Sequence, residues 1–254
     1  MTTKCIARAT PRRRVESVVV EPPEPTPVAW QHGARWLRGR LPSLLAVIAH
    51  GALVRGERVL QAPLELLAVV RSPPTPPVEA LQSEISPLLG GPRVELALLE
   101  AHGLGWLRPS ILQQSLRAGA VLLWGDPAAL AVVPDWPPGR LDPRLALDEQ
   151  AGAERDLAAG RLGLAVYRSA GALLIARRRY EPWFHRRLAA LHEVWLEVPP
   201  LPPNPEQAPA THFVTNAGVA LHDWLFTWEG AGPGLRAIGR YETMWRASRA
   251  AAAP

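Results

Sequence analysis

Apolar positions along the first 135 residues follow two periodicities, one typical of amphipathic helices and one typical of short buried strands. Apolar residues at every third or fourth position predict helices over residues 30–41, 78–89 and 109–119. Short apolar runs between turn residues predict strands over residues 44–48, 64–70, 94–99 and 120–124. Strands that alternate with helices favour an α/β layer in which helices cover a sheet.

The second half of the chain has only the helical periodicity. Helices are expected over residues 157–176, 183–198, 213–228 and 235–249. A proline-rich stretch at 134–139 marks a joint between the two halves. The sequence therefore predicts a flexible basic and proline-rich tail over 1–27, an α/β domain over 28–138 and a helical domain over 139–254.

Composition narrows the class of protein. Cys5 is the only cysteine, which excludes an intrachain disulfide and a cysteine-based metal site. The net charge is +5, and the arginines that supply it are scattered, which favours a solvated surface over a nucleic-acid groove. No apolar run approaches the roughly 20 residues that cross a bilayer. We therefore expect a soluble, cytoplasmic protein whose partners include neither a membrane nor nucleic acid.

A turn after the first predicted strand carries the candidate chemistry. The segment 50–57 reads His-Gly-Ala-Leu-Val-Arg-Gly-Glu, and it resembles the signature turn of the nucleotidyltransferase superfamily. In that family a strand ends in Gly-Ser, a short helix carrying Arg-Gly follows, and the next strand starts with Asp-x-Asp. Segment 62–70 holds the place of this acidic pair, and segment 93–97 holds the place of a third carboxylate. Segment 116–127 resembles the helix and strand of the antibiotic-modifying members, so the resemblance covers roughly residues 30–135.

This resemblance implies a nucleotidyltransferase-like mixed sheet with flanking helices, followed by an all-helical C-terminal domain. It also implies a nucleotide-binding turn and a metal site. The turn would consist of Gly51, Ala52, Arg55 and Gly56, because glycine lets the backbone approach a triphosphate. Glu65 and Glu95 would bind magnesium, which prefers carboxylate oxygens and neutralises the charge that develops on the phosphate oxygens.

The sequence departs from the family pattern at the positions that matter most for catalysis. Ala52 stands where the family has Ser, and Pro63 stands where the first Asp would bind metal. Glu65 replaces the second Asp, which keeps the charge but lengthens the side chain. Glu57 does not replace the lost ligand, since it lies before the intervening turn. The removal of a metal ligand should lower the rate by at least the roughly 100- to 1,000-fold that follows loss of an oxyanion-stabilising group.

We therefore expect a catalytically impaired pseudoenzyme that serves as a nucleotide-binding or protein-assembly subunit, and we assign no catalytic residue. The alternative is an active, metal-dependent enzyme that moves a nucleoside monophosphate to a hydroxyl of a small molecule or protein. Mg²⁺ would be the cofactor of that enzyme, and the pseudoenzyme would need none. A nucleoside triphosphate is the expected ligand. A homodimer or a heteromeric protein partner is expected because the family's helical domain often packs against a second subunit.

Other chemistry-bearing residues have weaker patterns. Arg179 and His185 have the spacing of an Arg-x-x-x-x-x-His ribonuclease motif, but we favour a solvated helix end as the explanation of the arginines there. His185 and His192 would share a helix face, but they have no evident third ligand for zinc. His222 and its neighbour Asp223 could form a base and its orienting group, and a surface pair is the reading that we favour. Tryptophans spread over the helical half favour core or interface packing.

Overall fold

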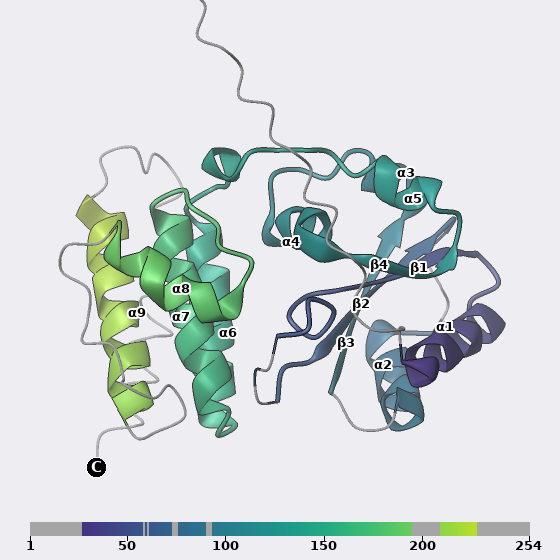
Figure 1. Ribbon diagram of the computed structural model, residues 1–254, viewed down its shortest axis with the longest axis horizontal. Helices are drawn as coiled ribbons and strands as arrows, with labels where there is room; N and C mark the ends of the chain where they lie inside the picture. The colour runs from purple at the N-terminus through teal and green to yellow at the C-terminus, as the bar shows by residue number, and fades with distance from the viewer. Residues whose placement is uncertain are drawn as a thin grey trace, which may run out of the picture.

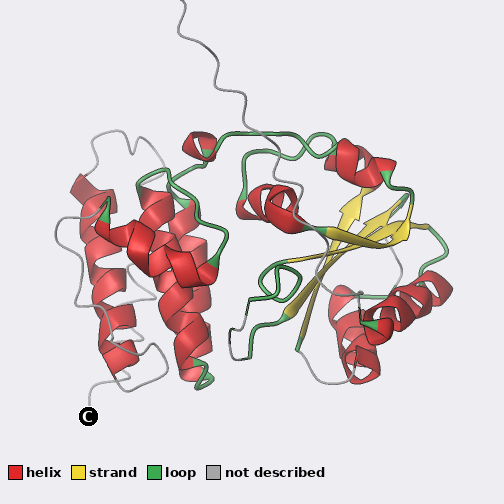
Figure 2. Cartoon of the chain, in the orientation of Figure 1, coloured by secondary structure: helices red, strands yellow, loops and turns green. Residues whose placement is uncertain are grey.

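The computed structural model describes residues 27–57, 59, 61–72, 76–89, 93–194 and 209–227. The expected tail, apart from Pro27, and the helix expected over 235–249 lie outside the described residues. Figure 1 shows a sheet with helices on both faces, and beside it a bundle of helices formed by the second half of the chain. Figure 2 shows that strands occur in the first of these parts and not in the described helical part.

The sheet has four strands, and their order across it is β3-β2-β1-β4. The strands are β1 (Leu44–His50), β2 (Leu64–Val70), β3 (Val94–Glu100) and β4 (Val121–Gly125). β1 is antiparallel to both β2 and β4, whereas β2 and β3 are parallel, so the sheet is mixed. All four strands lie where the sequence predicted them, within two residues at each end.

Helices cover the two faces of the sheet (Figure 1). One face is covered by α1 (Val28–Arg40), α2 (Val78–Ile85) and the 3₁₀ helix η1 (Ser86–Leu89). The other face is covered by α3 (Ala101–Leu104), α4 (Ile111–Gly119) and α5 (Ala128–Ala131). The expected α/β layer is therefore confirmed, and two short helices, α3 and α5, join the predicted ones.

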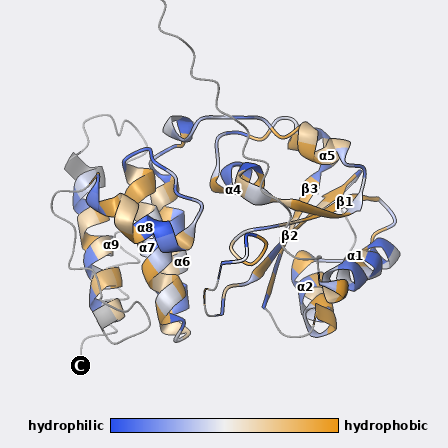
Figure 3. Cartoon of the chain, in the orientation of Figure 1, coloured by the Kyte–Doolittle hydropathy of each residue, from blue (hydrophilic) through white to orange (hydrophobic). Residues whose placement is uncertain are grey.

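Alternation along the strands divides the core into two apolar clusters, because successive strand residues point to opposite faces. Leu66 and Ala68 of β2 pack with the helices α1 and α2, whereas Leu67 and Val69 pack with α3, α4 and α5. Both faces of β2 are apolar over these positions, as expected of a strand covered by helices on each side. Figure 3 shows the strands coloured mainly as hydrophobic.

The second part of the chain is helical throughout its described residues. After the short 3₁₀ helix η2 (Pro138–Arg140), it contains α6 (Leu145–Ala158), α7 (Leu162–Ala176), α8 (Phe184–His192) and α9 (Pro209–Thr227). Helix α7 is central, since it packs against α6, α8 and α9, and most of its side chains are buried. Among the described residues, no helix has the length and apolar character that a membrane crossing requires.

Two helix predictions in this part were wrong. The single helix expected over 157–176 is divided by a turn at Gly160, whose φ of +73° suits glycine, so α7 begins only at Leu162. Helix α6 before this turn was not predicted. The residues that α6 buries are small or polar, including Gly152 and Asp156, so it lacks the apolar stripe that reveals a helix in a sequence. The helix expected over 183–198 ends at His192, and the residues after 194 are not described.

Candidate functional site

Three titratable residues form a row across the sheet, on the face that carries α4. His50 at the end of β1 pairs in register with Glu65 near the start of β2, and Glu65 pairs with Glu95 on β3. These three positions alternate with residues of the α1 and α2 cluster, so they point to the opposite face. The sequence placed Glu65 and Glu95 on neighbouring strands, and the structure brings them together. His50 belongs to the same row, although no role was expected for it from the sequence.

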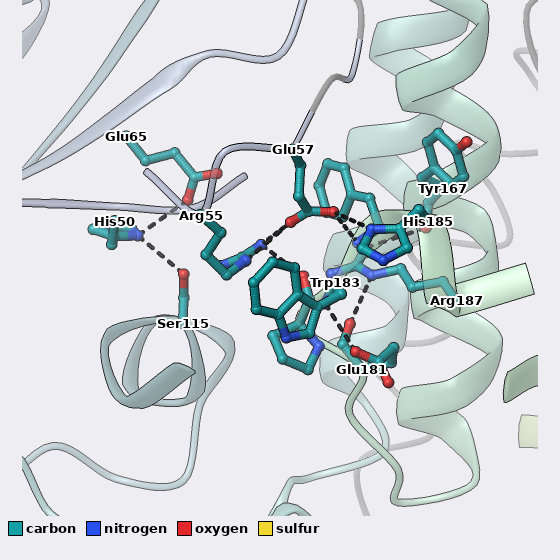
Figure 4. Close-up of polar contacts among 12 residues, drawn as sticks. His50, Arg55, Glu57, Glu65, Ser115, Tyr167, Glu181, Trp183, His185 and Arg187 are labelled. Carbon is teal, nitrogen blue, oxygen red and sulfur yellow. Dashed lines mark hydrogen bonds and ion pairs between the residues drawn. The ribbon is translucent and has the colours of Figure 1, made fainter. Parts of the chain in front are cut away.

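The carboxylate of Glu65 is held by His50. The Oε2 atom of Glu65 lies 3.2 Å from Nδ1 of His50, and the same nitrogen lies 3.1 Å from the hydroxyl of Ser115 on α4 (Figure 4). Burial alone would raise the pKa of Glu65. The hydrogen bond with His50 and the positive charges of His50, Arg168 and Arg55 outweigh burial, so the pKa of Glu65 is lowered. Glu65 is therefore a carboxylate that already has a basic partner.

The turn after β1 brings Gly51 against this carboxylate. Gly51 has a φ of +86°, and a Cβ at this position would collide with the carboxylate oxygen Oε1 of Glu65. Backbone hydrogen bonds from Arg55 N to Gly51 O and from Glu57 N to Ala52 O close the turn. The glycine is thus required by a close approach, and the group that approaches is a side chain of the same protein.

The turn is bound to the helical part of the chain by Arg55 and Glu57 (Figure 4). The guanidinium of Arg55 lies 2.8 Å from the carboxylate of Glu57 and donates a hydrogen bond of 2.6 Å to the carbonyl oxygen of Pro182. Glu57 accepts a 2.5 Å hydrogen bond from the backbone N–H of Phe184, at the start of α8. The side chains of Arg55 and Glu57 are only 3% and 2% exposed. These two residues therefore form a buried link between the two parts of the molecule.

An apolar contact lies beside this link, at the positions where the sequence lacks the family's polar groups. Ala52 and Ala62 are buried in a cluster with Leu164 of α7 and Phe184 of α8. Ala52 therefore lies in an apolar interface to the helical part, and Pro63 is buried next to Ala62 of the same cluster.

Glu95 is surrounded by arginines. Arg93 of the same strand region lies 2.6 Å from its Oε1 atom, and Arg168 of α7 lies 3.7 Å from its Oε2 atom. Arg168 also contacts Asp156 of α6, with its Nε atom 3.1 Å from Oδ2. Asp156 in turn pairs with Arg161 at 2.7 Å. Glu95 is thus the first residue of a network of charges that extends into the helical part.

Two cavities adjoin the row of titratable residues. One, of about 340 Å³, is lined by His50, Glu65, Glu95 and apolar residues of the sheet and α4. The other, of about 60 Å³, lies between the two parts of the chain and is lined by Gly51, Arg55, Glu65 and residues of the helices. Tyr180 also lines the smaller cavity, and burial raises the pKa of its phenol to about 12, so the phenol is neutral at physiological pH. The space directly beside the turn is therefore smaller than a typical ligand site of about 300–1,000 Å³, whereas the cavity at the row of titratable residues is within that range.

The donor set does not fit the magnesium ions that the sequence resemblance implies. Magnesium needs oxygen ligands at about 2.0–2.1 Å with near-octahedral geometry. Glu65 is paired with His50, and Glu95 is paired with Arg93 and Arg168. In the described part of the chain, no three His, Cys, Asp or Glu side chains are placed to share a metal ion. Basic side chains thus occupy the positions around both carboxylates.

The order of these parts decides the type of fold. A strand that ends in a glycine turn is followed by two strands whose carboxylates are in register, and a helical part packs against that edge. This arrangement is the mixed sheet with a helical part that the nucleotidyltransferase resemblance of the sequence implies. No protein-family model matches the sequence, and no curated protein matches it at the level of sequence.

The chain is similar to two solved structures. Spectinomycin adenyltransferase AAD(9) from Enterococcus faecialis, crystallised with ATP and spectinomycin, is 15% identical, with a TM-score of 0.49 over 76% of this chain and 98% of that one. A mutant of the toxin–antitoxin MntA-HpeT is 14% identical, with a TM-score of 0.30 over 49% of this chain and 90% of that one. At these identities the similarity concerns the type of fold and does not extend to activity.

The structure places the remaining predicted residues outside this row. Gly56 is exposed and has a φ of +71°. His185 lies 3.4 Å from Glu57, and Arg179 pairs with Glu193 at 3.0 Å, so the two residues of the ribonuclease spacing have separate carboxylate partners. The ring of His222 lies 3.8 Å from Asp223, as expected of neighbours on a helix.

Sequence reasoning missed several residues of the site. Glu57 was read as too distant to serve as a metal ligand, and its contact with Phe184 joins residues 127 positions apart. The sequence did not mark Arg168 or Arg187 as site residues, beyond placing them in helical segments. Arg187 pairs with Glu149 at 3.0 Å beside the smaller cavity. A signal did exist in Gly152 and Gly171, two glycines within helices that have no room for a Cβ because the guanidiniums of Arg168 and Arg187 lie against them.

The lowered pKa of Glu65 predicts a pH dependence of stability. A carboxylate whose pKa is lower in the folded than in the unfolded chain stabilises the fold above its ordinary pKa of 4.5, and this contribution is lost as the pH falls through the folded value. The difference in unfolding free energy between wild type and Glu65→Gln should therefore shrink as the pH falls below 4.5. Urea unfolding at several pH values measures this difference in unfolding free energy. Glu79→Gln, at an exposed position of α2, is the control, and a difference that stays constant or grows would contradict the assignment.

Proposed function

We propose that this chain is a catalytically inactive nucleotidyltransferase-like protein that acts as a protein-assembly subunit. The observation that carries the proposal is the occupation of the site by the protein itself. The helical part lies against the edge of the sheet where the family resemblance implies nucleotide and metal. Phe184 contacts Glu57 of the turn, and Arg168 contacts Glu95 of β3. The proposal concerns the role of the site, while the type of fold rests on the strand order and the turn.

The charges around the acidic row support the loss of catalysis. Two-metal catalysis needs carboxylates that are free to bind cations and to align the attacking and leaving oxygens. Glu65 and Glu95 have basic partners, and Pro63 offers no ligand at the place of the first Asp. A metal ion that entered this site would have to displace the mostly buried pair of Glu65 with His50 and the partly exposed pairs of Glu95 with Arg93 and Arg168.

The space at the turn supports the absence of nucleotide binding. In an active site of this family, the backbone glycine approaches the triphosphate, which carries several negative charges. Here the carboxylate of Glu65 lies against Gly51, so a phosphate would meet both a steric barrier and a like charge. Arg55, which the resemblance implies in nucleotide binding, is bound to Glu57 and Pro182.

An exposed apolar surface supports the assembly role. Trp106 is 83% exposed, Val132 51% and Trp136 40%. They are neighbours, because Trp136 donates a hydrogen bond from its indole to the carbonyl oxygen of Leu107, and Gly105 lies beside the backbone of Val132. Large exposed aromatic side chains that lie together are typical of protein interfaces. We call Trp106, Val132 and Trp136 the tryptophan patch.

A second copy of this chain is the proposed occupant of the tryptophan patch. A two-fold axis through such a patch would place apolar residues against the same residues of the partner. Next to Trp136, Arg117 and Asp135 form an ion pair at 3.5 Å, so charges of both signs border the patch and two copies need not repel each other there. The rim is thus compatible with self-association.

Pyrophosphate release tests the loss of catalysis. Wild type with ATP, CTP, GTP or UTP and either Mg²⁺ or Mn²⁺ should release no pyrophosphate above the buffer blank. The double variant Ala52→Ser with Pro63→Asp restores the family residues and should also release none. It should be less stable than wild type in urea, because it buries polar groups beside the apolar cluster of Phe184.

The single variant Ala52→Ser is the control for this experiment, since a small hydroxyl should lower the stability less than a buried carboxylate. Metal-dependent pyrophosphate release by wild type that disappears in Glu65→Gln would establish the rival reading, an active transferase. Pyrophosphate release by the double variant but not by wild type would mean that the residues at positions 52 and 63 account for the whole loss of catalysis. The helical part would then not block the site.

Sedimentation velocity over a wide range of concentration tests the assembly role. The 27.7 kDa chain should sediment as a dimer, and Trp106→Glu should shift it to the monomer because a charge would be buried in the apolar interface. Leu88→Glu changes an exposed leucine on the other face of the sheet and should leave the dimer intact. A wild type that remains monomeric at the highest concentration would contradict self-association through the tryptophan patch.

A further inference from the structure

Two carboxylates, one from each part of the chain, contact the guanidinium of Arg168, and two more line the same cavity. Glu95 of β3 lies 3.7 Å from its Nη2 atom, and Asp156 of α6 lies 3.1 Å from its Nε atom. Glu65 of β2 and Glu149 of α6 line the same small cavity as Arg168. We call these four carboxylates and Arg168 the Arg168 cluster. It joins both predicted metal ligands, Glu65 and Glu95, to two acidic residues of a helix.

The position of Arg168 is closely determined. Its side chain is 17% exposed, and one of its terminal nitrogens lies against Gly152, where a Cβ would have no room. Burial disfavours its charge, but the negative charges of Glu149, Glu95, Asp156 and Glu65 outweigh burial and raise the pKa of Arg168. A fully charged guanidinium is therefore held at the centre of the acidic residues.

We propose that the guanidinium of Arg168 is the resident cation of this acidic cluster, in the place where the sequence resemblance implies divalent metal. The proposal deepens the proposed loss of catalysis and rests on it, because it names the group that keeps metal from the surviving carboxylates. The positive charge that neutralises the β2 and β3 carboxylates is covalently attached to α7. The same charge therefore holds the helical part against the sheet.

The geometry suits a guanidinium better than a small divalent ion. Glu95 and Asp156 contact different nitrogens of one planar group, which can donate hydrogen bonds in several directions at once. A magnesium ion would require both carboxylates to move toward a common centre at about 2.0–2.1 Å. With Arg168 removed, Oε2 of Glu95 and Oδ2 of Asp156 lose their cation, while Arg93 still lies within 4 Å of both carboxylates and keeps them close together.

The test is the creation of a divalent-ion site by removal of Arg168. Binding of Mn²⁺ is measured through the electron paramagnetic resonance signal of free Mn²⁺, and unfolding is followed by thermal denaturation with and without MnCl₂. Wild type should show no saturable Mn²⁺ binding. Arg168→Ala should show saturable binding of about one Mn²⁺ per chain, through two carboxylates and water. Mn²⁺ should also raise its melting temperature.

Three matched variants make the test specific. Arg168→Lys keeps a positive charge and should bind no Mn²⁺. Arg168→Ala with Glu95→Gln and Asp156→Asn removes two of the expected ligands and should lose the binding that Arg168→Ala gained. Arg168→Gln is nearer in size to the native residue, and it serves as the neutral variant if Arg168→Ala does not fold.

Two outcomes would overturn the proposal. One is saturable Mn²⁺ binding by wild type that Glu95→Gln weakens, since the cluster would then accept metal with Arg168 present. The other is the absence of Mn²⁺ binding in Arg168→Ala and in Arg168→Gln, when at least one of these two variants is folded. Pyrophosphate release by a wild type that binds no Mn²⁺ at the cluster would instead overturn the proposed function and leave the role of Arg168 intact.

Discussion

Charge pairing across the boundary between the sheet and the helical part is the constraint on which the rest of this structure depends. Arg55 and Glu57 link the turn after β1 to the start of α8, and Arg168 links α7 to Glu95 on β3. The Arg55–Glu57 pair tolerates little change, because both side chains are buried and removal of one leaves the other charge without compensation. The helical part is thereby fixed over the edge of the sheet where the candidate site lies.

The fixed contact of the helical part with the sheet explains where the chain departs from the nucleotidyltransferase pattern. A helical part that packs on the turn needs apolar residues there, and Ala52 and Ala62 supply them against Leu164 and Phe184. The carboxylates that remain are useful to the same contact, since they pair with basic side chains of both parts. We therefore interpret the site as one converted from ligand binding to internal packing, which differs from a site that has merely lost residues.

The α/β part was predictable from sequence because its strands are continuous apolar runs and its helices have apolar stripes. Glu65 and Glu95 could be placed on neighbouring strands from the order of the motif alone. The partners of these carboxylates could not be predicted, because Arg168 reaches them through long-range packing and lies on a helix whose sequence indicates only burial. Helix α6 was missed for a similar reason, since it buries Gly152 and Asp156 against charged side chains. The domain limits at 27 and 138 remain predictions.

The central claim is that the protein itself fills its nucleotide site, and calorimetric titration with nucleoside triphosphates tests it most directly. Each of ATP, CTP, GTP and UTP is titrated into wild type with and without Mg²⁺. We expect no saturable heat under any of these conditions, because the carboxylate of Glu65 occupies the approach to Gly51. Saturable binding of about one nucleotide per chain that Gly51→Ala abolishes would contradict the claim that the protein fills its own site.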